Sequence, residues 1–89
     1  MQKKPESLDE KTYFTVINTL GTVYYQTGYY NNARKQFLYI IKMDPGYYQA
    51  YYNIGLVNEK LKEIKLAIES FKKASELKPD FVDAYYHVG

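Results

Sequence analysis

The chain has 89 residues, a length that suits one small domain with a thin margin of stability. Hydrophobic residues at 46% and charged residues at 25% are typical of an ordered globular chain. The absence of cysteine excludes disulfides, thiolate metal sites and a cysteine nucleophile, and a formal net charge of +2 with both signs interspersed gives no electrostatic footprint for nucleic acid or an anionic membrane.

Short helices are predicted along the chain, because apolar residues recur with helical spacing. In chain order we expect them over residues 8–27, 30–43, 47–60, 63–77 and 81–89. Ser7 and Glu10 have the spacing of a capping box that opens the first helix. Gly28 is expected to end that helix, and Pro45 and Pro79 to end the second and fourth, because a residue before proline disfavours the helical conformation.

The sequence repeats itself at an offset of 34 residues. The stretch PGYYQAYYNIG at 45–55 returns as PDFVDAYYHVG at 79–89. The residues that recur in register are Gly21, Gly55 and Gly89; Ala33 and Ala67; Phe37 and Phe71; Pro45 and Pro79; Tyr51 and Tyr85; and Tyr52 and Tyr86. A fixed period of this length indicates a repeat architecture.

Glycine inside a predicted helix requires an explanation, because it costs about 1 kcal/mol relative to alanine. Gly21 stands one helix away from Ala33, and the pair recurs 34 residues later. We predict that small residues facing each other let the two helices approach closely, while Phe37, a turn later, fills the wider part of the interface.

This repeating pattern resembles that of the tetratricopeptide repeat family, which over 34 residues is W-x2-L-G-x2-Y…A-x3-F…P. The matching positions are Ile17, Leu20, Gly21, Tyr24, Ala33, Phe37 and Pro45 in the first unit, Tyr51, Ile54, Gly55, Ala67, Phe71 and Pro79 in the second, and Tyr85, Val88 and Gly89 at the start of a third. The departures are Ile17 and Tyr51 in place of tryptophan, Asn58 in place of tyrosine, and Lys62 where the first unit has Gly28.

The resemblance implies an all-α fold in which antiparallel helix hairpins stack as a short right-handed α-solenoid of about five helices. The expected organisation is an N-terminal flank with the start of the first helix at 1–11 and a repeat domain at 12–89, divided into unit one at about 14–47, unit two at 48–81 and the first helix of a third unit at 82–89. Because Tyr85 and Val88 remain available for a following helix, we expect a piece of a longer array. The alternative is a short chain that completes itself by dimerising.

The resemblance also implies a concave groove, lined by the first helix of each unit, that binds a peptide or a partner's helix. The residues expected to contact the partner are Asn18, Thr22, Tyr25, Gln49, Tyr52, Asn53, Leu56, Tyr86 and His87. Tyrosines offer rigid amphipathic contact area, and asparagines offer paired donors and acceptors. The alternative interpretation of Tyr52 and Tyr86 is that they only cover a neighbouring helix.

One subgroup of the family binds chaperone C-termini through a basic clamp around the terminal carboxylate. At the matching positions this chain keeps Asn53 but has Asn18 and His87 in place of basic residues. It also has Thr22 in place of an asparagine and Asp83 in place of a lysine, and an acidic residue there would repel a carboxylate. We therefore do not expect chaperone C-terminus binding.

The sequence predicts a protein–protein interaction module or scaffold with a protein or peptide partner. We expect no catalytic activity, no cofactor and no metal, because His87 is the only histidine and no nucleophile or ligand cluster accompanies it. We also expect no nucleic-acid or membrane partner and a cytoplasmic location. The alternative function is self-association, as a homodimer formed through the exposed C-terminal helix.

Overall fold

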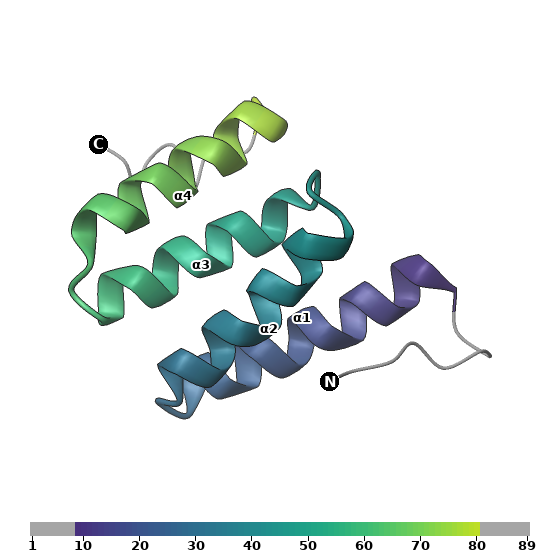
Figure 1. The fold of residues 1–89 in the computed structure, drawn as a ribbon, viewed down its shortest axis with the longest axis horizontal. Coiled ribbons are helices and arrows are strands. Elements are labelled where there is room, and N and C mark those ends of the chain that lie inside the picture. Colours follow the sequence, from purple (N-terminus) through teal and green to yellow (C-terminus); the bar gives the residue numbers. More distant parts are fainter. Residues whose placement is uncertain (1–8, 81–89) are drawn as a thin grey trace.

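The computed structural model of the chain describes residues 9–80, which fold into four helices (Figure 1). The helices are α1 (Glu10–Gln26), α2 (Tyr30–Met43), α3 (Tyr48–Lys60) and α4 (Ile64–Leu77). The first four predicted helices are confirmed, each end to within a couple of residues. The expected number of about five exceeds the four in the described part, and the fifth predicted helix, 81–89, lies outside it.

The start of α1 differs from the prediction. Asp9 is the N-cap, and its carboxylate Oδ1 accepts a hydrogen bond from the backbone N–H of Thr12 at 2.7 Å. The predicted capping box is therefore wrong: Glu10 is the first helical residue, and Ser7 lies outside the described residues. The physical reason is that aspartate is also a strong cap former, and Asp9 stands directly before the helix.

Both second helices end before the predicted prolines. Asp44 and Lys78 precede Pro45 and Pro79, and both have extended backbone angles, with φ of −141° and −136°. This is the conformation that a following proline favours.

The turns inside the two hairpins have the same geometry with different residues. Gly28 follows α1 with φ of +90°, and Lys62 follows α3 with φ of +65°. The amide of the next residue then donates at 2.8 Å to a carbonyl near the end of the preceding helix in both turns. The turn requires left-handed backbone, which glycine adopts freely and lysine does not.

The helices pack in chain order: α1 on α2, α2 on α3, and α3 on α4, with α1 also reaching α3 (Figure 1). The main core cluster is made of Tyr13, Phe14, Ile17, Ala33, Phe37, Ile40, Ala50, Ile54 and Val57. The result is a stack of two helix hairpins, with α1 and α4 at its ends and α2 packed on both sides.

The two helical glycines each lie directly against an aromatic ring of the second helix of their hairpin. A Cβ added at Gly21 would lie 2.6 Å from Cε1 of Phe37, and one added at Gly55 would lie 2.4 Å from Cε1 of Phe71. Both phenylalanines are buried. The predicted close approach is therefore present, but the expected partner is wrong: the nearest atoms belong to the phenylalanine rings rather than to the alanines.

A polar contact joins the two units at Asn58, which is only 3% exposed. Arg34 Nη1 donates at 2.8 Å to the side-chain oxygen of Asn58 and at 2.8 Å to Oε2 of Glu63, and Arg34 Nη2 donates to Asn31 at 3.1 Å. The departure from the repeat pattern at Asn58 thus has a hydrogen-bond donor from unit one, as a buried amide requires.

The apolar residues of α4 are only partly buried. Ala67, Phe71 and Ala74 face α3 and are buried, whereas Ile64 is 54% and Ile68 39% exposed. The reason is that α4 packs mainly against α3, the helix that precedes it, within the described part of the chain.

Candidate partner-binding groove

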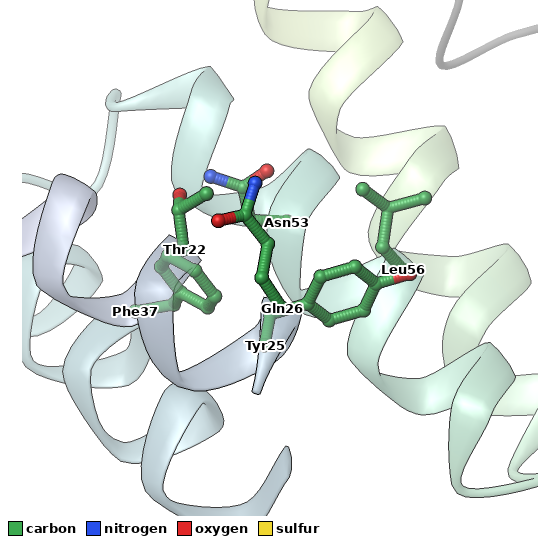
Figure 2. Close-up of a pocket in the computed structure, with 6 residues that line it drawn as sticks. All are labelled: Thr22, Tyr25, Gln26, Phe37, Asn53 and Leu56. Atoms are coloured by element: carbon green, nitrogen blue, oxygen red, sulfur yellow. The ribbon is translucent and has the colours of Figure 1, made fainter. Parts of the chain in front are cut away.

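A pocket of about 220 Å³ lies between the first helices of the two units (Figure 2). Its lining, which we call the groove pocket, consists of Thr22, Tyr25 and Gln26 from α1, Phe37 from α2, and Asn53 and Leu56 from α3. In Figure 2 the ring of Tyr25 points toward Leu56, and the amide of Gln26 extends toward Asn53. The two first helices therefore supply the walls of the pocket.

Phe37 of α2 reaches the groove pocket because α1 has a glycine, Gly21, where the two helices meet. Its ring lies against the Cα of Gly21, where any side chain would collide with it. The repeat pattern assigned Phe37 to packing alone and did not indicate its part in the pocket. The signal was present in the pairing of Gly21 with a bulky ring one helix away.

Two asparagines connect the walls of the groove. Nδ2 of Asn53 on α3 donates at 2.9 Å to Oδ1 of Asn18 on α1, and both residues are half-buried. On α1 the hydroxyl of Thr22 donates at 2.9 Å to the backbone carbonyl of Asn18. The edge of the groove pocket thus carries amide groups and a hydroxyl whose hydrogen is already used within the helix.

Tyr25 forms an aromatic contact at the end of the groove pocket. Its ring centroid lies 5.7 Å from that of Tyr30 on α2. Burial, followed by Tyr30, the carboxylate of Glu59 and Tyr52, raises the pKa of the Tyr25 hydroxyl above its usual value. Tyr25 is therefore neutral at physiological pH and serves as an apolar surface with a polar tip.

The other predicted contact residues have different places. Tyr52 packs its ring against Phe71, with centroids 5.6 Å apart, which is the covering role of the alternative interpretation. Gln49 is exposed at the start of α3 and does not line the pocket. Tyr86 and His87 lie outside the described residues.

A second depression, open toward α2 and α4, lies on the other side of α3. It is lined by Arg34, Leu38, Ile54, Asn58, Leu66, Glu69 and Ser70. Its two leucines, Leu38 and Leu66, are about half exposed. Arg34 is tied to Asn58 and Glu63, so its guanidinium has hydrogen-bond partners there.

The described residues contain no cluster of three or more histidine, aspartate or glutamate side chains that would hold a metal ion. No helix between residues 9 and 80 is both long and apolar enough to cross a bilayer.

Stacked hairpins with a concave groove between their first helices define a helical-repeat protein. Two sequence models, both described as tetratricopeptide repeat, match residues 14–47 and 48–81. The chain belongs to the tetratricopeptide repeat family.

Similar proteins include one curated relative and several solved structures. The chain is 32% identical over 72 residues to the tetratricopeptide repeat domain-containing protein PYG7, chloroplastic, of Arabidopsis thaliana, a match that covers 81% of this chain and 24% of the relative. A crystal structure of MamA superposes with a TM-score of 0.81 at 28% identity, covering 84% of this chain and 44% of MamA. The TPR2B domain of yeast Sti1, in a complex with pHsp70, superposes with a TM-score of 0.80 at 29% identity, covering 84% of this chain and 60% of the Sti1 chain. The chain spans less than two thirds of each of these proteins.

Proposed function

We propose that this protein-interaction module binds a peptide or a partner's helix in the groove between α1 and α3, and that it has no catalytic activity of its own. The observation that carries the proposal is the groove pocket, a cavity of about 220 Å³. Four of the predicted contact residues line it: Thr22, Tyr25, Asn53 and Leu56. A concave, mostly apolar pocket with a few polar groups is the usual form of a binding site. The complex of the Sti1 domain supports the use of this fold in partner binding.

The pull-down that tests the proposal compares two variants with the same change of charge. Leu56→Lys places a cation on the wall of the groove pocket, whereas Leu66→Lys places one on α4, outside that pocket. Both leucines are partly exposed, so both variants should keep their helicity in circular dichroism. We expect partners captured by the wild-type chain to be retained by Leu66→Lys and lost by Leu56→Lys. Equal capture by all three proteins would contradict the groove as the binding site.

Self-association is the alternative function. It was predicted to use Tyr85 and Val88, which lie outside the described residues, so it stays a prediction. A monomeric mass in light scattering across a range of concentrations would exclude it. The cytoplasmic location also stays a prediction, and the name of the plant relative places that protein in the chloroplast.

A further inference from the structure

We infer that the groove pocket binds an uncharged apolar side chain, of the size of leucine or phenylalanine, from the interior of a partner's peptide chain rather than a terminal carboxylate. The inference rests on the proposed function and specifies its ligand. Four observations carry it: the uncharged lining, the volume, the hydrogen-bonding groups at the edge and the charge beside the pocket.

The lining is uncharged and largely apolar. The rings of Tyr25 and Phe37 and the side chain of Leu56 form its apolar surfaces, and none of the six lining residues is a lysine, arginine or histidine. A carboxylate placed here would lose hydration without gaining a cationic partner, which is strongly unfavourable. An apolar side chain gains free energy from the same burial.

The volume fits one side chain of moderate size. The groove pocket encloses about 220 Å³. An apolar cavity of roughly 150 Å³ lined by leucine, isoleucine and phenylalanine is already large enough for benzene. A leucine or phenylalanine side chain therefore fits, with its backbone at the mouth of the pocket.

The polar groups at the edge match a continuing peptide backbone. The hydroxyl hydrogen of Thr22 is donated to the carbonyl of Asn18, so the oxygen of Thr22 presents lone pairs to the groove. Lone pairs attract a backbone N–H and repel a carboxylate, which only accepts hydrogen bonds. Asn53 has two Nδ2 hydrogens and a carbonyl oxygen, and its bond to Asn18 uses one of those hydrogens.

A negative charge lies beside the groove pocket. Glu59 is one turn after Leu56 on α3, and its carboxylate is one of the groups that raise the pKa of Tyr25, after burial and Tyr30. A ligand carboxylate beside Tyr25 would feel the same charge. The neighbouring Lys60 is exposed and is not a lining residue of the pocket.

The test uses two phage libraries of random ten-residue peptides, selected against the 89-residue chain. One library is fused at both ends, so that no free carboxylate is present, and the other ends in a free C-terminus. We expect the first library to give binders that share one apolar residue at a fixed position. Such a peptide is then synthesised with both ends blocked. If its shared residue is leucine, replacing that leucine by alanine should weaken binding on the order of 50-fold, because three buried carbon groups are lost.

Variants of the chain link the peptide to the pocket. Leu56→Lys should weaken the blocked peptide at least about tenfold, because its cation disrupts apolar burial, whereas Leu66→Lys should leave the affinity unchanged. Thr22→Val keeps the shape of the side chain and removes its oxygen, so it should weaken the peptide by about three- to tenfold. Thr22→Ser keeps the hydroxyl and is its matched control.

The outcomes separate the inference from the proposed function. If the binders require a free C-terminal carboxylate or an acidic residue, and still lose affinity in Leu56→Lys, the inference is overturned while groove binding stands. If no library yields a binder, or if Leu56→Lys and Leu66→Lys bind the peptides equally, both are overturned.

Discussion

The two hairpins have the same helix order and the same turn geometry but differ in what covers them. In unit one, α2 packs against α1 on one side and α3 on the other, whereas in unit two α4 packs mainly against α3 within the described residues. Tyr30 of α2 is half-buried against Tyr25, and its repeat counterpart, Ile64 of α4, is 54% exposed. The same position in a repeat is therefore buried where another unit packs against it and exposed where none does within the described residues.

The two units also differ in how they fill one position on the first helix. Unit one has Tyr24, whose ring lies 6.3 Å from that of Tyr29. Unit two has the buried Asn58, whose oxygen accepts from Arg34 of the preceding unit. The comparison shows that a polar residue is accommodated in unit two because unit one supplies its donor.

The largest effect is expected from alanine at the two helical glycines. The added Cβ would overlap a buried phenylalanine ring, and overpacking of this kind costs about 1–3 kcal/mol, offset by up to about 1 kcal/mol of improved helix propensity. We expect Gly21→Ala to destabilise the chain more than Gly55→Ala, because α2 is held on two sides and cannot move away. Urea unfolding followed by circular dichroism measures both free energies.

A larger loss of stability in Gly55→Ala than in Gly21→Ala would contradict this expectation. The added Cβ lies closer to the ring at Gly55 than at Gly21, at 2.4 Å against 2.6 Å. A larger loss in Gly55→Ala would mean that this distance, rather than the freedom of the neighbouring helix to move, sets the free energy of unfolding.

An effect of similar size is expected from removing the donor that joins the units. Arg34→Leu leaves the side-chain oxygen of Asn58 buried without that donor, and an unsatisfied buried acceptor costs about 1–3 kcal/mol. The control is a double-mutant cycle with Asn58→Tyr, which restores the residue type of unit one. In that background we expect Arg34→Leu to cost much less, and strictly additive free energies would contradict the contact between the units.

The smallest effect is expected at the two left-handed turn residues. Lys62→Gly should stabilise the chain by about 1 kcal/mol or slightly less, because φ of +65° is unfavourable for lysine. Gly28→Ala should destabilise it by about the same amount. No heavy atom beyond Gly28 and its two chain neighbours is within 4 Å of the Cβ that Gly28 would gain, so the loss of stability would come from the backbone conformation alone. Thermal midpoints of the two variants measure both changes, and a Lys62→Gly variant no more stable than wild type would show that the lysine side chain compensates for its backbone.

Features written locally in the sequence were predictable, and contacts between units were not. The helix ends at Gly28 and before Pro45 follow from the backbone chemistry of single residues, and the structure has them there. The N-cap was missed because Ser7 and Asp9 both favour caps, and only the position of the first helical residue decides between them.

The candidate groove also has residues that the sequence predicted and contacts that it did not. The repeat pattern placed Tyr25, Asn53 and Leu56 on the facing helices, and these residues do line the pocket. It could not indicate that Phe37 would form part of the lining or that Arg34 would reach Asn58, because both depend on how far one helix stands from the next. Such distances result from the sum of many side-chain contacts and have no local signature.

The hydrogen bond between Asn18 and Asn53 has a mechanical consequence. It joins α1 of one repeat to α3 of the next at 2.9 Å, so it acts as a tie that helps to fix the distance between these two helices. Because that bond uses only one Nδ2 hydrogen of Asn53, a ligand can accept the other hydrogen while the tie stays in place. The two walls of the groove would then keep the same spacing with and without a ligand.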